Sequence, residues 1–255
     1  MKVKSIVALL GLSASLSVFA DPFVPNDPAQ SPIGPTPGSE QSLQTIADTL
    51  FGAGHVNVAT QQNPAAFFTF ATSSTTSIPT MVAEFTANSS NQSFGIWFGT
   101  DTTHFVTRDL LLGPAQVGDN AAISIVGNTL QVGSTDSGAC GTRVNCGTFT
   151  NSLVNSGSFG FFFRPNGLNT SPTYFSLDQM NTPDPLGRPD RVLAFQDGST
   201  TNWMFSYEDG SDFDYNDMAV KVESITAAVP EPETYALMLA GLGAMGFMAR
   251  RRKSR

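Results

Sequence analysis

From residue 66 to residue 225 the hydrophobic and polar positions alternate with a period of two, which is typical of half-buried β-strands. Clusters of Gly, Asn, Ser, Thr and Pro separate the short runs, as in antiparallel sandwiches. The expected strands are Ala66–Ala71, Thr80–Thr86, Ser93–Gly99, Thr102–Thr107, Ala121–Val126, Thr129–Gly133, Ser158–Arg164, Thr173–Leu177, Arg191–Phe195, Asn202–Glu208 and Met218–Ile225. The pattern therefore predicts a mainly β protein, an antiparallel β-sandwich or jelly roll over residues 39–229.

One segment before the strands has a helical period instead. Its apolar positions at i, i+3, i+4 and i+7 are Leu43, Ile46, Ala47 and Leu50. Such spacing gives one apolar face, so we expect a single N-terminal helix over residues 40–51. Ser39 is the expected N-cap and Gly52 the expected end.

The first twenty residues, 1–20, have the pattern of a secretory signal peptide. Lys2 and Lys4 precede the apolar stretch 5–18, and small residues lead to a cut before Asp21. A retained membrane helix is the alternative, but the run is short for a span. Residues 21–38 are rich in proline, so we expect an extended, poorly ordered leader.

The other end of the chain, residues 230–255, is a second targeting segment. Pro230, Glu231 and Pro232 precede an apolar run, residues 235–249, which predicts a short C-terminal helix. Such a helix spans about 22 Å, less than the roughly 30 Å of a membrane core. The basic cluster that follows is Arg250, Arg251, Arg252 and Lys253, and it should stay cytoplasmic.

These three parts together resemble the PEP-CTERM sorting signal, which an exosortase recognises and removes in Gram-negative bacteria that make extracellular polysaccharide. The resemblance implies export, with signal peptidase and an exosortase as partners. It also implies a transmembrane precursor in the inner membrane, then a place at the cell surface or in the extracellular matrix. A plain tail anchor is the alternative, so removal or retention of the tail stays open.

The charge of the chain excludes one class of partner. The 13 basic and 21 acidic residues become 6 and 19 once both ends are removed, a net charge of −13. Such a surface repels phosphate backbones, so nucleic acid is not expected as a partner. The negative surface suits calcium binding and a well-solvated protein outside the cell.

The chain has two cysteines, Cys140 and Cys146, separated by a short stretch that contains Gly141. An exported chain matures in an oxidising compartment, so we predict a disulfide between them. Zinc is the weaker alternative, because no histidine lies nearby to complete a tetrahedral set.

The most informative stretch is the acidic run at residues 208–217. Crowded carboxylates repel one another unless a cation offsets them, and oxygen ligands suit Ca²⁺. We expect one Ca²⁺ as a cofactor, bound by Asp209, Asp212, Asp214, Asn216 and Asp217. An extended backbone would put Asp212, Asp214 and Asn216 on one side, while Glu208 ends the preceding strand. A solvated turn without an ion is the alternative. An EF-hand is excluded, because Asp217 stands where that loop needs Gly and no exit helix follows.

This run also resembles the domain-of-unknown-function family 4114, through Glu208-Asp209 and the stretch Asp212–Asp217. Weaker matches are Phe94–Trp97 and Arg191–Phe195, so the resemblance covers residues 40–226. The family occurs in secreted and surface proteins and has no established activity. Ser211 departs from the pattern, where the gap often ends in Gly.

The sequence contains few residues in recognised catalytic motifs, and we expect no enzyme activity. His55 and His104 lie in no metalloprotease or nucleophile motif, and no phosphate-binding loop occurs. Four aromatic residues fit a sugar-stacking platform or a sandwich core: Trp97, Trp203, Tyr207 and Tyr215.

The first interpretation of the function is a calcium-stabilised surface or matrix protein associated with exopolysaccharide in a biofilm. A carbohydrate-binding or adhesive module and a polysaccharide hydrolase are the alternatives. The specific polysaccharide and the oligomeric state stay open.

Overall fold

The computed structural model describes residues 26–27, 30–38, 40–71, 76–84, 92–113, 119–134, 143–155, 157–167, 172–181, 190–198 and 200–228, with the backbone alone for 76–84. Several predictions from the sequence concern residues outside this part of the chain. They are the signal peptide, Cys140, the sorting residues Pro230, Glu231 and Pro232, the C-terminal apolar helix, and the basic residues 250–253.

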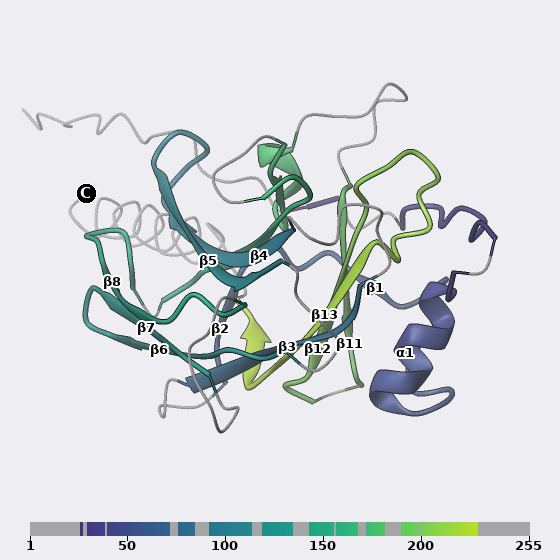
Figure 1. The fold of residues 1–255 in the computed structure, drawn as a ribbon, viewed down its shortest axis with the longest axis horizontal. Helices are drawn as coiled ribbons and strands as arrows, with labels where there is room; N and C mark the ends of the chain where they lie inside the picture. The colour runs from purple at the N-terminus through teal and green to yellow at the C-terminus, as the bar shows by residue number, and fades with distance from the viewer. Residues whose placement is uncertain are drawn as a thin grey trace, which may run out of the picture.

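Two antiparallel sheets form the body of the molecule, with a two-stranded sheet beside them (Figure 1). The eight-stranded sheet has the order β1 (Gln62–Asn63), β11 (Val192–Gln196), β12 (Trp203–Tyr207), β13 (Met218–Glu223), β3 (Thr76–Glu84), β6 (Ala122–Val126), β7 (Thr129–Gly133), β8 (Gly147–Thr150). The four-stranded sheet has the order β10 (Tyr174–Phe175), β9 (Gly160–Arg164), β4 (Ser93–Gly99), β5 (Phe105–Leu112). Strands β14 (Ile225–Ala227) and β2 (Phe68–Phe70) pair separately, and a 3₁₀ turn, η1, covers Asp178–Met180. The predicted fold class, mainly β with antiparallel sheets and one helix, is confirmed.

Individual strands differ from the prediction where a turn intervenes. Strands β4 and β7 have the predicted bounds, whereas the short strands β1 and β8 were not predicted. Strand β5 begins at Phe105 rather than Thr102, because the Asp101 carboxylate accepts the backbone N–H groups of Thr103 (2.8 Å) and His104 (2.9 Å) in a tight turn. The predicted last strand is two strands, separated at Ser224 with φ 64°.

The predicted helix is present as α1, Leu43–Phe51, but its start was predicted three residues too early. Ser42, not Ser39, is the N-cap, since its Oγ accepts the Thr45 N–H at 3.3 Å. Gly52 ends the helix as expected, with φ 97° and its N–H donated to Asp48 O at 3.0 Å. The buried face of α1 packs on the outer face of the eight-stranded sheet, against Leu193 and Phe195.

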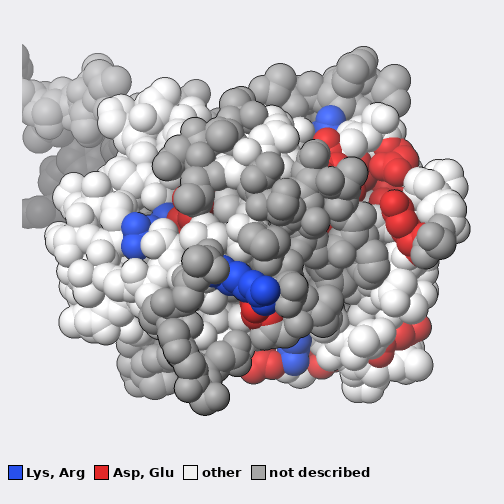
Figure 2. Space-filling model, viewed as in Figure 1, with Lys and Arg blue, Asp and Glu red and all other residues white. Residues whose placement is uncertain are grey.

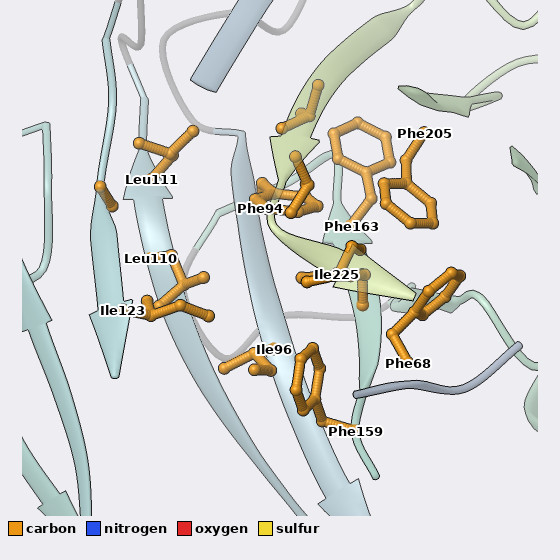
Figure 3. Packing of buried hydrophobic residues seen from close by; sticks show 14 of the residues in the cluster. Phe68, Phe94, Ile96, Leu110, Leu111, Ile123, Phe159, Phe163, Phe205 and Ile225 are labelled. Carbon is orange, nitrogen blue, oxygen red and sulfur yellow. The ribbon is translucent and has the colours of Figure 1, made fainter. Parts of the chain in front are cut away.

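The main core lies between the two large sheets and is rich in phenylalanine (Figure 3). Phe161 of β9 lies 5.4 Å from Phe94 of β4 and 4.7 Å from Phe205 of β12, measured between ring centroids, so the rings link both sheets. The four aromatic residues considered for sugar stacking, Trp97, Trp203, Tyr207 and Tyr215, are all fully buried. They fill the interior and present no platform to a sugar.

Residues 30–38 of the proline-rich leader contact the domain. The Ser31 N–H donates to Gln62 Oε1 and Gln62 Nε2 donates to Ser31 O, both at 2.8 Å. Ile33 packs against the cluster that contains α1. These contacts connect residues 30–38 to β1 and α1, and the poor order of the leader stays a prediction.

Candidate metal centre

Residues 208–217, here called the acidic turn, connect β12 to β13, which pair in register from Tyr207 opposite Met218. Figure 2 shows acidic side chains gathered at the edge of the molecule where Figure 1 places this turn beside the segment that leads to α1. The two strands that carry the turn are buried along most of their length, so its base is fixed.

The backbone of the acidic turn is not extended. The prediction that alternate residues share one side had assumed an extended backbone. Phe213 and Tyr215 have φ values of 58° and 56°, in the left-handed region that costs a non-glycine residue about 1–2 kcal/mol. Burial of both rings offsets this cost, since Phe213 is 5% exposed and Tyr215 is fully buried. The Tyr215 hydroxyl also donates to Asp190 O at 3.0 Å. The turn is thus held in an unusual conformation by its two aromatic side chains.

Three carboxylates converge at the turn within the described residues: Glu40, Asp212 and Asp214. One oxygen of each lies within 4.8 Å of the other two. Two oxygens that bind the same Ca²⁺ are at most about 4.6–5.2 Å apart, twice the Ca–O distance, so each pair in the group is close to the separation that a shared ion requires. Asp214 is 1% exposed, whereas Glu40 and Asp212 are exposed and leave the group open to solvent.

Asn216 orients one of these carboxylates. Its Nδ2 donates to Asp214 Oδ2 at 2.7 Å and to Gln41 O at 2.9 Å. Its backbone N–H points to Asp214 Oδ1 at 3.4 Å. An amide that donates to a ligand carboxylate fixes the direction of that carboxylate. The structure therefore places Asn216 behind Asp214, as its support.

Asp209 and Asp217, also predicted as ligands, form a neighbouring pair outside the three-carboxylate group. The Asp209 N–H donates to Asp217 Oδ2 at 2.6 Å, and Asp209 Oδ2 is buried without a hydrogen-bond partner among the described residues. Arg191 lies beside the pair, with its guanidinium 4.9 Å from the Phe213 ring centroid, and donates to Gly210 O at 2.7 Å. Burial raises the pKa of Asp209, and the positive charge of Arg191 opposes only part of that rise.

Glu208, expected to end the preceding strand, follows β12 directly and is fully buried. Its Oε1 accepts the Gly210 N–H at 2.8 Å, and its Oε2 accepts the Tyr215 N–H at 3.3 Å. Both oxygens are thus used to shape the turn.

Burial and mutual repulsion raise the pKa values of the turn. Burial raises the pKa of Asp217 to about 8, with Asp209 and Glu208 adding to the effect. Burial raises the pKa of Glu208 to about 7 and that of Asp214 to about 6, and Asp212 adds to both. Glu40 also contributes at Asp214. A site of this kind gains stability by binding either protons or a cation.

Sequence reasoning missed Glu40, which lies just before α1 and far from the acidic turn in the chain. No local pattern connects the two, because only the packing of α1 on the sheet brings them together.

A second acidic group was also missed. Asp178 and Asp190 flank a cavity of about 30 Å³ together with Asp27, and burial and Asp190 raise the pKa of Asp178 to about 8. That cavity has room for about one water molecule.

Only one of the two cysteines lies in the described part of the chain. Cys146 is half-buried against the main core, and Cys140 lies outside the described residues. The disulfide between them stays a prediction.

The comparisons with known proteins bear on the C-terminal segment. Residues 228–253 match the PEP-CTERM protein-sorting motif. This motif marks an exported protein that an exosortase processes. It includes Pro230, Glu231, Pro232 and the basic cluster from Arg250 to Lys253. No curated protein and no solved structure is significantly similar to the chain. Within the described part of the chain, no helix combines the length and apolarity that a membrane span requires.

Proposed function

We propose that this exosortase-targeted protein is a non-enzymatic component of the cell surface or extracellular matrix, with an acidic turn that binds one structural Ca²⁺. The proposal includes association with exopolysaccharide in a biofilm and a transient inner-membrane anchor in a Gram-negative host. It also includes the resemblance of the central domain to family 4114.

The convergence of Glu40, Asp212 and Asp214 within 4.8 Å carries the calcium part of the proposal. Two like charges 4 Å apart repel by about 1 kcal/mol in water and about 4 kcal/mol near a protein surface. A solvated turn would relieve this by letting the side chains diverge. Asp214 cannot diverge freely, because it is buried and held by Asn216. A hard cation with oxygen ligands is the simplest partner for such a group.

Neither alternative function gains support from the described residues. The aromatic side chains that would stack on a sugar are buried. For a hydrolase, the acidic pair Asp178 and Asp190 flanks a cavity of only about 30 Å³. The two histidines make local contacts with carboxylates, His55 with Asp197 at 3.2 Å and His104 with Asp101 at 2.9 Å, and both side chains are mostly exposed. Each histidine thus has a local carboxylate partner and lies in no wider catalytic group among the described residues.

A thermal melt with calcium and with chelator tests the proposal. Affinity should be that of an extracellular module, on the order of 10⁻⁴ to 10⁻³ M. At ten times the dissociation constant the ion adds about 1.4 kcal/mol by mass action. For a domain of this size that raises Tm by about 3–6 °C.

Asp214→Asn should lose this shift, because it removes the buried ligand charge and keeps the side-chain shape. Glu223→Gln is the matched control, since it removes one carboxylate that pairs with Lys221 (2.6 Å) at the far end of β13. It should keep the full shift. Equal melting temperatures of the wild type in calcium and in chelator would refute the calcium site.

A further inference from the structure

The eight-stranded sheet ends on one side in β8, which Figure 1 places at one end of the molecule. Its outer edge pairs with no other strand among the described residues, and Gly147, Thr148 and Thr150 are exposed. Edge strands offer unpaired N–H and C=O groups to other strands, so proteins usually shield them with charges, proline or a covering segment. Strand β8, with the sequence Gly-Thr-Phe-Thr, contains neither a charged residue nor a proline.

The other three edges of the two large sheets are shielded. Strands β1 and β10 have only two residues each, and Pro64 follows β1. Strand β5 is long, but it carries the charged residues Arg108 and Asp109. A neighbouring segment also covers its end, where the Leu112 N–H donates to Arg143 O at 2.7 Å. Strand β8 is therefore the one edge in the described part of the chain that lacks such protection.

The register of β8 on β7 shows which backbone groups reach the open edge. The Asn151 N–H donates to Asn128 O at 3.1 Å, so these two residues form a hydrogen-bonded pair. In an antiparallel ladder, hydrogen-bonded pairs alternate with pairs whose N–H and C=O groups point away from each other. Phe149 lies two residues before Asn151 in the same register and so also bonds to β7. The N–H and C=O groups of Thr148 and Thr150 must then point to the open edge.

These outward groups are self-complementary. With a two-fold axis at Phe149, Thr148 of one copy faces Thr150 of the other, and each facing pair exchanges both of its N–H···O bonds. The threonine side chains then lie side by side on the outer face, as Thr129 and Thr150 do, with 2.9 Å between their hydroxyl oxygens. The Phe149 ring stays inside, since it packs against the main core with the Arg108 guanidinium 5.8 Å from its centroid.

The charge distribution permits a second copy at this edge. Figure 2 shows acidic side chains concentrated on the side of the acidic turn, and few at the end where Figure 1 places β8. Strands β6, β7 and β8 contain no charged residue. Physiological salt screens exposed charges beyond about 8 Å. Two such edges can therefore approach with little repulsion, although each chain is acidic.

We propose that two copies of this chain associate through β8, antiparallel and with the two-fold axis at Phe149. The two eight-stranded sheets then become one continuous sheet. A strand of four residues makes a small interface, below the roughly 1,200 Å² at which stable complexes begin. The association is therefore weak, and it depends on the concentration of the chain.

Sedimentation velocity of the full chain in a neutral detergent, over the range of about 10 µM to 1 mM that suits a weak complex, tests this dimer. The wild type should shift from monomer to dimer as its concentration rises. The double variants Thr148→Lys/Thr150→Lys and Thr148→Glu/Thr150→Glu should each dimerise at least about tenfold more weakly, because like charges then meet across the axis. Both positions are exposed, so the fold should tolerate the charges.

Mixing the two charged variants gives the sharpest result. Lysines of one chain then face glutamates of the other, so a heterodimer should form although neither variant dimerises alone. The matched control is Ser124→Lys/Val126→Lys, which puts two lysines on the same outer face of β6, two strands away from the open edge. Val126 is 62% exposed, and this control should dimerise like the wild type.

Hydrogen exchange of individual amides, followed by NMR, tests the register independently. The amides of Thr148 and Thr150 should exchange more slowly as the concentration rises, because they become bonded only in the dimer. The Phe149 amide is already bonded to β7 and should not change. Protection of Phe149 instead of its two neighbours would overturn the proposed edge.

Four sedimentation results would also overturn the proposal. The first is a wild type that stays monomeric up to about 1 mM, the weak limit of the measured range. The second is association that persists unchanged in both charged variants, since it would then arise elsewhere, for example at the apolar C-terminal segment. The third is a mixture of the charged variants that forms no heterodimer. The fourth is a control that loses dimerisation, because general charge and not the edge of β8 would then decide it.

Discussion

Replacing Gly160 with alanine should destabilise the domain through one identifiable collision. Gly160 on β9 lies opposite Trp97 on β4. A Cβ at residue 160 would lie 2.2 Å from Trp97 Nε1 and 2.4 Å from Cε2. The indole cannot step aside easily, because it is fully buried and its ring lies against Phe67 (5.2 Å between centroids) and Phe175 (6.0 Å).

The magnitude follows from two opposing effects. Overpacking of a filled core costs about 1–3 kcal/mol. Replacing Gly with Ala also restricts the unfolded chain, which returns about 0.4–1 kcal/mol. The net loss in the free energy of unfolding should therefore be about 1–2 kcal/mol. For a domain of this size that lowers Tm by about 2–8 °C.

Urea denaturation in saturating calcium measures this loss, and a second strand glycine gives the control. Gly133 on β7 has no atom within 4 Å of its hypothetical Cβ and no left-handed backbone, so Gly133→Ala should be neutral or slightly stabilising. Adding Trp97→Phe to Gly160→Ala should recover part of the loss as a positive coupling in the double-mutant cycle. If Gly160→Ala were as stable as Gly133→Ala, the account of this close approach would be refuted.

Three further predictions concern the charges and the covalent structure. In chelator, the free energy of unfolding should fall as the pH rises from 5 to 8, because burial raises the pKa of Asp214, Glu208 and Asp217 to about 6, 7 and 8. The folded state then holds protons that the unfolded state has released, and this stability is lost as each group ionises. Calcium should flatten the dependence in urea titrations, and a rise in stability over this range would contradict the burial argument. Unreduced, denatured protein should take up no thiol label at Cys140 or Cys146, and reduction should cost about 2 kcal/mol or less for so short a loop. Mass spectrometry of the mature protein should find Asp21 at its start and no peptide from Arg250–Arg255, whereas an intact C-terminus would favour a plain tail anchor.

The sequence predicted the elements best where local pattern and environment agree. The bounds of β4 follow from apolar residues that alternate over a buried stretch, and Gly52 ends α1 because glycine tolerates the backbone conformation found there. Strand β8 escaped notice because it is short and mostly exposed, with little apolar pattern to detect. The start of α1 was misplaced because two serines, Ser39 and Ser42, fit the N-cap preference, and only the hydrogen bond to Thr45 distinguishes them.

The candidate site was only half predictable, for a different reason. The density of carboxylates in residues 208–217 identifies a charged turn, but aromatic residues such as Phe213 and Tyr215 favour extended strands in statistics. Their left-handed backbone depends on partners elsewhere, namely α1 and Asp190, so alternation gave the wrong side-chain directions. Glu40 could not be found from any local pattern, because its position beside Asp214 depends on how α1 docks. Non-local packing decides which carboxylates come together here, while local composition decides only that a cation is expected.

The arrangement of the core argues that the proposed calcium would act locally and would not decide whether the domain folds. Strands β12 and β13 pair through backbone hydrogen bonds up to Tyr207 and Met218, and both residues are fully buried. The phenylalanine-rich core between the sheets contains none of the turn's carboxylates. The ion's contribution of about 1.4 kcal/mol at ten times its dissociation constant is small beside the 5–15 kcal/mol of a typical domain. If the proposed calcium site is right, chelation should therefore leave one cooperative unfolding transition at a slightly lower temperature. The aromatic core between the sheets thus maintains the fold whether or not the acidic turn holds an ion.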